Sequence, residues 1–186
     1  MNHNFCAEYD NVRIRPLYQE DIENLRVWRN NTQQTRFLRP IGTITREMQE
    51  KWFEKYLENP FEIVFAIEEI CDLNRMVGSL ALYDIKENVA EIGKIQIGDP
   101  EASGRGIGRK SLVMAMKIGF ELLRLKKIIA SVHQDNITAR TNDLRIGFEI
   151  VGEHESVVGG IEDELEIDYE KLRLVNSYVD DIKTEK

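Results

Sequence analysis

The feature that most constrains this chain is a glycine-rich loop between an apolar, β-prone segment and a helical pattern. Gly104, Gly106 and Gly108 alternate along the loop, and the segment 95–97 before it has the composition of a strand. After the loop, apolar residues recur at the spacing of one helix face, at Leu112, Val113, Met116, Phe120 and Leu123. The first amides of a helix have no partner inside it, and glycines let a backbone approach a phosphate closely. The stretch 95–120 therefore predicts an anion site.

Three interpretations of the loop compete. A P-loop requires Gly-x-x-x-x-Gly-Lys-Ser/Thr, but Gly108 follows Gly104 too soon for this motif. A dinucleotide-binding loop requires Gly-x-Gly-x-x-Gly, but Ser111 stands where the third glycine would follow Gly106 and Gly108. A glycine-rich turn without a ligand is the third interpretation. Positive charge at this end of the helix favours an anion, and it comes from Arg105, Arg109 and Lys110.

The composition limits the class of protein. A chain of 186 residues, 42% hydrophobic and 31% charged, is expected to form one domain over residues 1–186 with a proper core. No apolar run is long enough to span a bilayer, and the N-terminus lacks a signal-peptide core. Cys6 and Cys71 have no metal-ligand spacing, so we expect no metal site and a cytoplasmic location. The net charge of −8 argues against nucleic acid or an anionic membrane as a partner and allows a cationic amine.

Alternation, apolar runs and turn residues divide the rest of the chain into strands and helices. Strands are predicted at 12–16, 63–67, 76–83, 90–97, 127–132, 148–151 and 165–169. Besides the helix after the glycine loop, helices are predicted at about 20–30, 45–59 and 136–145. The residues from about 175 to 186 look frayed. An antiparallel meander followed by a helix crossover predicts an α+β (mixed α/β) fold rather than a doubly wound one.

The order of elements and four motifs together resemble the GNAT acyltransferase superfamily, from about residue 12 to residue 151. The run 14–30, with Ile-Arg-Pro-Leu at its start and Trp-Arg-Asn at its end, resembles the branch that acetylates ribosomal-protein N-termini and amino-sugar nucleotides. Ala-Glu-Ile-Gly at 90–93 resembles the fourth strand of that branch, and 104–108 resembles the pyrophosphate loop for acyl-CoA. The run 136–139 and the later Gly147-Phe148 resemble the final helix and strand. The resemblance implies a central twisted mixed sheet of about seven strands with helices on both faces.

The resemblance also implies an activity, an acetyl-CoA-dependent N-acetyltransferase. An amine of an amino sugar, a small molecule or a protein N-terminus would attack the thioester directly in a ternary complex. The strand around 95–97 would bond the pantetheine, and the loop would hold the pyrophosphate. Asn136 could bond the CoA arm, although helix capping explains an asparagine there equally well. The residues expected to bind the cofactor are Ile95, Gln96, Ile97, Ser103, Gly104, Arg105, Gly106, Ile107, Gly108, Arg109 and Asn136.

Two carboxylates are candidates for proton transfer. Glu91 is the candidate general base, acting through water, and the alternative is a solvent-facing strand residue. Asp143 stands seven residues after Asn136, where many members carry a tyrosine that protonates the leaving thiolate. A carboxylate could serve as this acid only if burial raised its pKa, and the alternative is a helix-surface residue. Trp28 and Arg29 could line the acceptor pocket, or the tryptophan could simply belong to the core.

Two further functions remain open. Asp143 at the acid position, and Ser103 where the family loop has glutamine or arginine, would suit a catalytically retired acyl-CoA-binding sensor or interaction module. A nucleotide-binding protein using the same loop for ATP or NAD is disfavoured by the glycine spacing. Tyr169 is a spare acid candidate, while His133 and His154 show no triad or ligand spacing. A free sheet edge near the C-terminus would allow a homodimer.

Overall fold

The computed structural model describes residues 3–31, 36–38 and 41–186, and one nine-stranded sheet runs through it in the order β7-β8-β6-β5-β4-β3-β2-β1-β9. The strands are β1 (Cys6–Tyr9), β2 (Val12–Pro16), β3 (Ile63–Glu69), β4 (Arg75–Lys86), β5 (Val89–Ile97), β6 (Lys127–His133), β7 (Glu149–Glu155), β8 (Ile161–Ile167) and β9 (Lys183–Glu185). Within this sheet only β5 and β6 pair in parallel, and the other neighbours pair antiparallel.

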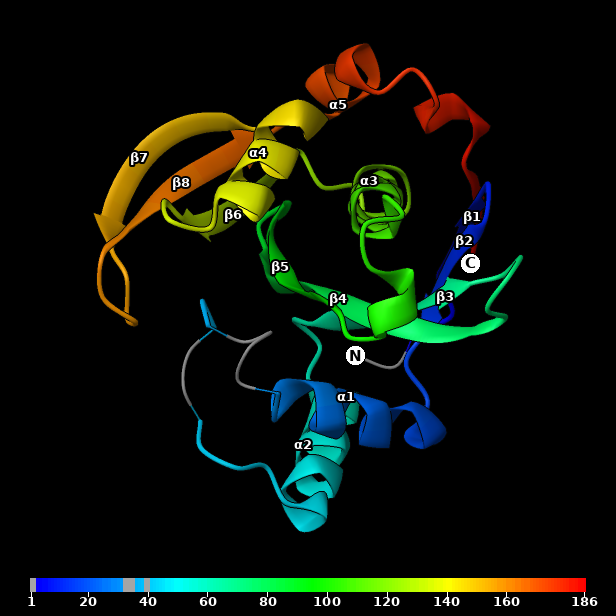
Figure 1. The fold of residues 1–186 in the computed structure, drawn as a ribbon. Coiled ribbons are helices and arrows are strands. Elements are labelled where there is room, and N and C mark those ends of the chain that lie inside the picture. Colours follow the sequence, from blue (N-terminus) through cyan, green and yellow to red (C-terminus); the bar gives the residue numbers. More distant parts are fainter. Residues whose placement is uncertain (1–2, 32–35, 39–40) are drawn as a thin grey trace.

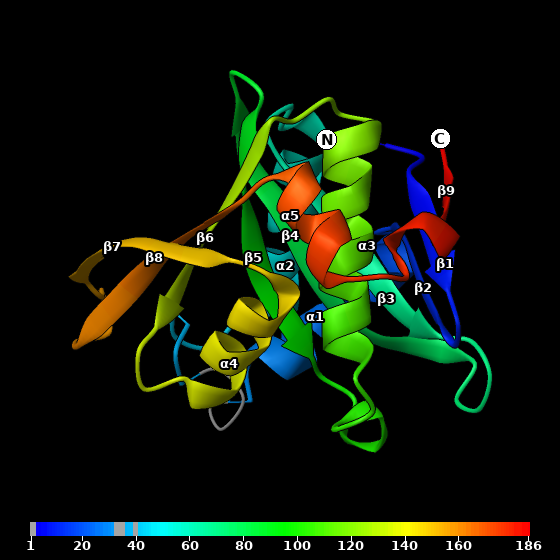
Figure 2. The same cartoon turned by 90° about the horizontal axis from the view of Figure 1, so that it is seen from above.

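Helices cover both faces of the sheet (Figure 1). On one face lie α1 (Ile22–Arg29) and α2 (Arg46–Glu58), and on the other lie α3 (Ile107–Glu121), α4 (Ile137–Ile146) and α5 (Tyr169–Val175). Figure 2 shows that α3 runs along the middle of its face. The predicted mixed α+β sheet with helices on both faces is confirmed, but it has more strands than the seven expected. None of the helices in the described residues is long and apolar enough to cross a membrane.

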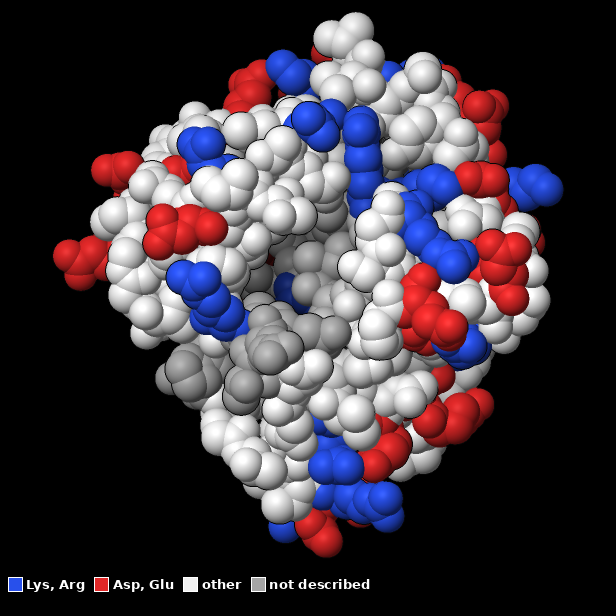
Figure 3. All heavy atoms as spheres, viewed as in Figure 1, with Lys and Arg blue, Asp and Glu red and all other residues white. Residues whose placement is uncertain are grey.

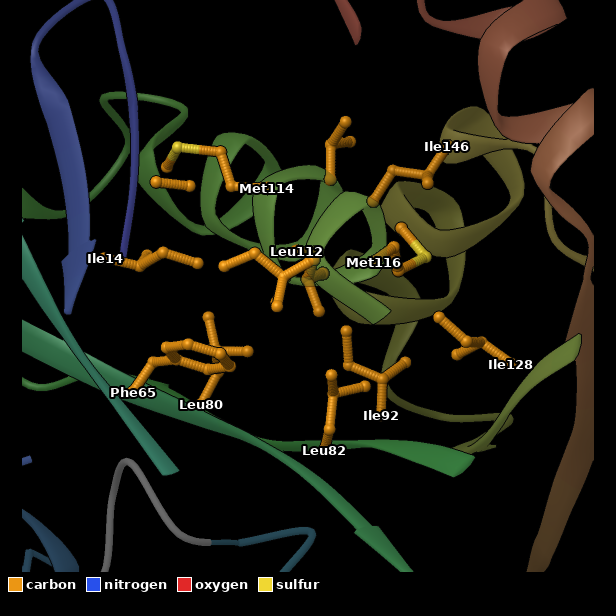
Figure 4. Packing of buried hydrophobic residues seen from close by; sticks show 14 of the residues in the cluster. Ile14, Phe65, Leu80, Leu82, Ile92, Leu112, Met114, Met116, Ile128 and Ile146 are labelled. Carbon is orange, nitrogen blue, oxygen red and sulfur yellow. The ribbon is translucent and has the colours of Figure 1, made fainter. Parts of the chain in front are cut away.

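The strand β3 shows how sequence leads to this layering. Its residues are apolar on both sides, because both sides are covered. Phe65 belongs to the main core beneath α3, while Val64 and Ala66 belong to a second cluster beneath α1 and α2. Figure 4 shows the main core, in which strand residues face residues of α3. The labelled residues include Ile14, Phe65, Leu80, Leu82 and Ile92 on the strands, and Leu112, Met114 and Met116 on α3.

The C-terminal residues are folded, and here the sequence-based prediction was wrong. The tail from about 175 to 186 was expected to be frayed, but β9 pairs with β1 as the outer strand of the sheet. Val179 and Ile182 are buried in the main core. The ammonium group of Lys117, itself buried, donates hydrogen bonds to the backbone oxygens of Val179 and Ile182 at 2.7 and 3.0 Å. Apolar burial and a satisfied buried charge therefore fix a segment whose polar strand carries little sequence signal.

Candidate active site

The sheet opens between its two parallel strands. β5 and β6 pair only over three residues, with Glu91 opposite Ile129 as the last pair. Beyond Glu91, β5 continues to Ile97 without β6 beside it, while β6 pairs with β8 up to His133. The surface is hollowed in front of β5, between the ends of α3 and α4 that face the viewer (Figure 3). The parting of the two strands therefore leaves one side of β5 accessible.

A bulge lies on β5 just beyond Glu91. Gly93 pairs with Ala81 of β4, whereas Gln96 pairs with Ser79, so β5 has one residue more than β4 over this stretch. Lys94, in the bulge, has a φ of 51°, in the left-handed region that residues other than glycine seldom adopt. A bulge leaves backbone groups outside the ladder. The strand thus offers polar backbone groups to a ligand where the sheet opens.

The glycine loop leads into α3 at the same end of β5. Gly104 and Gly106 have φ values of 74° and 73°, and Gly106 is the N-cap of α3. A Cβ at either glycine would have no neighbour within 4 Å, so the loop is open on its outer side. The first backbone amide of α3 that has an acceptor one turn back is that of Lys110, which donates to the backbone oxygen of Gly106. The amides at 107–109 therefore lack intrahelical acceptors, as an anion site requires.

The basic side chains of the loop and of the first turn of α3 all have protein partners. Arg105 lies 3.2 Å from Asp72, and Lys110 lies 2.5 Å from Asp10. Arg109 donates to the backbone oxygen of Arg145 and to the side chain of Asn176, both at 3.2 Å, and its buried Nε has no partner in the described residues. Lys and Arg side chains nevertheless gather over the front end of α3 (Figure 3). Because the basic side chains already have partners, we expect the backbone amides to be the main donors to a bound anion, and the nearby positive charge would add to their attraction.

The predicted pantetheine segment borders a shallow groove of about 370 Å³, which is lined by Ile95, Gln96, Ile97, Asp99, Pro100 and Ser103. A Cβ added at Gly108 would lie 3.6 and 3.7 Å from the side chains of Ile95 and Ile97, so the first turn of α3 rests directly on β5. The groove therefore joins the opened strand to the glycine loop, and most of the predicted cofactor residues lie along this one path.

The predicted base Glu91 is half-buried and hydrogen-bonded. The hydroxyl of Tyr83 donates to its Oε1 at 2.6 Å. Burial, and then the bond to the carboxylate, raise the pKa of the tyrosine well above its usual range, so the phenol stays protonated. Sequence reasoning missed Tyr83, although the hairpin pairing of β4 with β5, which places it opposite Glu91, could have revealed it.

Asp143 lies on the inner face of α4. It follows Ala139 by one helical turn and precedes Ile146, and both of these residues pack against the main core. Burial raises the pKa of Asp143 from 3.8 to about 7. In the described residues, no side chain or amide donates a hydrogen bond to its carboxyl group. The carboxyl group therefore meets the condition that an acid at this position requires.

Two other predicted residues have clear structural roles. The Oδ1 atom of Asn136 accepts a bond from the amide of Ala139 at 3.3 Å, so Asn136 caps α4. Tyr169 begins α5 instead of ending a strand, and its hydroxyl donates to Glu121. Its ring stacks on Phe120 at a centroid distance of 5.3 Å. These contacts account for both side chains without a ligand.

Trp28 and Arg29 stand where α1 ends. The indole of Trp28 packs on the backbone just after β5, because a Cβ at Gly98 would lie only 2.0 Å from its Cδ2. The backbone oxygen of Trp28 accepts a bond from the side-chain Nε2 of Gln96 at 2.9 Å. Burial lowers the pKa of the half-buried Arg29 from its ordinary value. The end of α1 thus adjoins the opened strand on the face opposite to α3.

The opened sheet, the bulge on β5 and the helix start with unpaired amides lie along one path, which has room and donors for an elongated molecule that carries phosphate groups. Residues 11–149 match the profile of the acetyltransferase (GNAT) domain. The spermidine N(1)-acetyltransferase of Escherichia coli (strain K12) is 29% identical over 154 residues, 80% of each chain.

Solved structures share this fold. One is spermidine N-acetyltransferase from Vibrio cholerae in complex with CoA and spermine, with a TM-score of 0.79 and 22% identity over 87% of this chain and 98% of that one. Another is Mycobacterium smegmatis RimJ in complex with CoA-disulfide, with a TM-score of 0.72 and 21% identity over 87% of this chain and 83% of that one.

The chain belongs to the acetyltransferase (GNAT) family. The predicted superfamily, the enzyme class of N-acetyltransferase and the use of acetyl-CoA as acyl donor are confirmed.

Proposed function

We propose that this enzyme transfers the acetyl group of acetyl-CoA to a primary amine of a polyamine-like cation, with Glu91 as general base and Asp143 as general acid. The observation that carries the proposal is the parting of β5 from β6 immediately after Glu91, on the same strand that the groove beside the glycine loop follows as far as Ile95. In this position the thioester of CoA would lie within reach of the base.

The chemistry of the open sheet face supports a cationic acceptor. Register pairs place one row of side chains across five strands, and the row runs Tyr83, Glu91, Ile129, Glu166 and Glu149. Side chains that are paired in register lie on the same face of a sheet. Two residues further along β8, Glu164 and then Glu162 lie on this face as well. Glu166 and Glu149 are paired with Lys127 and Lys171, both at 2.6 Å. The carboxylates of Glu91, Glu164 and Glu162 are those that favour a positively charged molecule over a neutral or anionic one.

The similarity to spermidine acetyltransferases favours the same class of acceptor. An amino sugar or a protein N-terminus would also supply an amine, but neither needs several carboxylates along its path. A polyamine carries a second and third positive charge at a distance from the reacting nitrogen, and the carboxylates of β8 could hold these charges. The acceptor would enter over the face on which α1 and α2 lie.

The proposed reaction forms a C–N bond and breaks the C–S bond. The amine nitrogen attacks the acyl carbon, and its proton passes through water to the carboxylate of Glu91. A backbone amide of the bulge around Lys94 would face the carbonyl oxygen as negative charge develops on it. When the C–S bond breaks, the thiolate takes a proton from the carboxyl group of Asp143, whose pKa of about 7 keeps part of it protonated near neutral pH.

Thiol release from acetyl-CoA with a panel of amines tests this function. We expect turnover with spermidine and spermine, and slower turnover with an amino sugar or a peptide bearing a free N-terminus. If the amino sugar or the peptide reacts best, the proposed class of acceptor is wrong, but the protein is still an acetyltransferase. If no amine reacts while CoA still binds, the protein is the retired acyl-CoA-binding module. The raised pKa of Asp143 favours the enzyme over that alternative.

A further inference from the structure

The contact between Tyr83 and Glu91 has a geometry suited to orienting a base. The two residues are opposite each other on β4 and β5, beside the point where the sheet opens. The hydroxyl of Tyr83 bonds one carboxylate oxygen, Oε1, at 2.6 Å. In the described residues, no other hydrogen bond to this carboxylate is present. The second oxygen is therefore left for water or substrate.

The ring of Tyr83 has two close neighbours on β5. One is Gly93, where a Cβ would be 3.0 Å from the hydroxyl oxygen and 3.4 Å from Cε1, so a larger residue would displace the hydroxyl by a few tenths of an ångström. The other is the ammonium group of Lys94, which lies over the ring, 4.3 Å from the centroid. Lys94 is itself 2.5 Å from Glu62, whose side chain is buried. A cation over the ring and a backbone close to the hydroxyl restrict the direction of the hydroxyl.

We propose that Tyr83 is a positioning residue, which turns the carboxylate of Glu91 toward the acceptor amine, and that Gly93, Lys94 and Glu62 hold Tyr83 in turn. The inference rests on the proposed role of Glu91. The phenol donates to one carboxylate oxygen and so fixes the rotation of the carboxylate group. One oxygen is used by the bond, and the other points to the attacking water.

Other charges around the pair stay constant in a comparison of variants. Glu62 and Lys94 form one ion pair, and Lys127 and Glu166 on β6 and β8 form another at 2.6 Å. Asp84 and Glu62 act on Tyr83 through space and contribute to its raised pKa. Since Tyr83→Phe removes one oxygen atom and leaves all these groups in place, a change in kcat would report the hydroxyl alone.

The experiment compares kcat and KM for acetyl transfer to spermidine in the wild type, Tyr83→Phe and Tyr56→Phe. Tyr56 is the matched control, because its buried hydroxyl lies in the same apolar cluster and accepts a bond from the amide of Val64 at 3.2 Å, away from the base. For Tyr83→Phe we expect kcat to fall roughly tenfold, because the carboxylate is no longer held in the direction of the amine. KM for acetyl-CoA should not change.

A second variant keeps the test decisive if Tyr83→Phe folds poorly. Gly93→Ala retains the hydroxyl but displaces it by a few tenths of an ångström, and kcat should fall by a smaller factor than in Tyr83→Phe. Tyr56→Phe should leave kcat unchanged.

An unchanged kcat in Tyr83→Phe, or a loss that appears only as a raised KM for acetyl-CoA, would overturn the inference. Glu91→Gln separates the two hypotheses. If it keeps wild-type activity, the proposed base is wrong; if it is inactive while Tyr83→Phe has the wild-type kcat, only the positioning role is wrong.

Discussion

Replacing Asp143 with asparagine should stabilise the protein, and increasingly so as the pH rises. The carboxyl group lies on the inner face of α4, and burial raises its pKa from 3.8 to about 7. A difference of about three pKa units corresponds to ~4 kcal/mol at about 1.36 kcal/mol for each unit. The side chain keeps partial exposure, so about 2–3 kcal/mol is the expected gain in the free energy of unfolding for Asp143→Asn at pH 8.

The sign follows from proton binding in the two states. Below pH 3.8, Asp143 is protonated in the folded and the unfolded protein, and its titration costs the wild type nothing. Between pH 3.8 and about 7, the unfolded chain loses this proton while the folded protein keeps it, so the stability of the wild type falls as the pH rises. Above about pH 7 both states are ionised and the deficit stays constant.

Urea denaturation of the wild type and Asp143→Asn at pH 4, 6 and 8 measures this difference. Other titrating groups are common to both proteins and cancel in the comparison. The expected result is a difference that is smallest at pH 4 and largest at pH 8. A difference of the same size at all three pH values would refute the argument, because it would show that desolvation of the charged carboxylate does not govern the effect.

Three further substitutions test other parts of the structure. Gly106→Ala places a side chain at a φ of 73°, which should cost ~1 kcal/mol of stability, and the added Cβ would stand on the open side of the loop, so calorimetry should show weaker CoA binding; unchanged affinity would argue against the loop. Gly98→Ala forces a Cβ to within 2.0 Å of Trp28 and should cost about 2–3 kcal/mol, seen as a lower Tm; an unchanged Tm would mean that the indole moves freely. Lys117→Met leaves the backbone oxygens of Val179 and Ile182 without their donor and should cost about 2 kcal/mol in urea denaturation; no loss would mean that the C-terminal segment is not held by this lysine.

The strands that sequence reasoning found are those with a strong apolar signal. β3 and β6 carry buried apolar residues, and both were predicted within two residues of their observed ends. β1 and β9 were missed because they are four and three residues long, and β9 consists of Lys, Thr and Glu. Only pairing along the sheet makes such segments strands, and pairing between residues so far apart in sequence cannot be seen in local composition.

The candidate site also has parts that follow from local sequence and parts that depend on tertiary structure. The glycine loop and the helix after it follow from local sequence, since glycine spacing and helical periodicity are local properties. Asp143 was weighed as a helix-surface residue, yet its position one turn after Ala139 puts it on the inner face of α4. The bond from Tyr83 to Glu91 and the approach of Trp28 to Gly98 depend on register and on helix docking. Neither is encoded within one element.

We propose that backbone amides at the start of α3 hold the diphosphate of CoA, so that the thioester lies beside Glu91. A crystal structure of the complex with CoA tests this placement most directly. We expect phosphate oxygens within about 2.7–3.2 Å of amides in the segment 104–109, with the thiol end of the cofactor near the parting of β5 and β6. A structure in which the diphosphate binds elsewhere, and these amides contact only solvent or side chains, would contradict it.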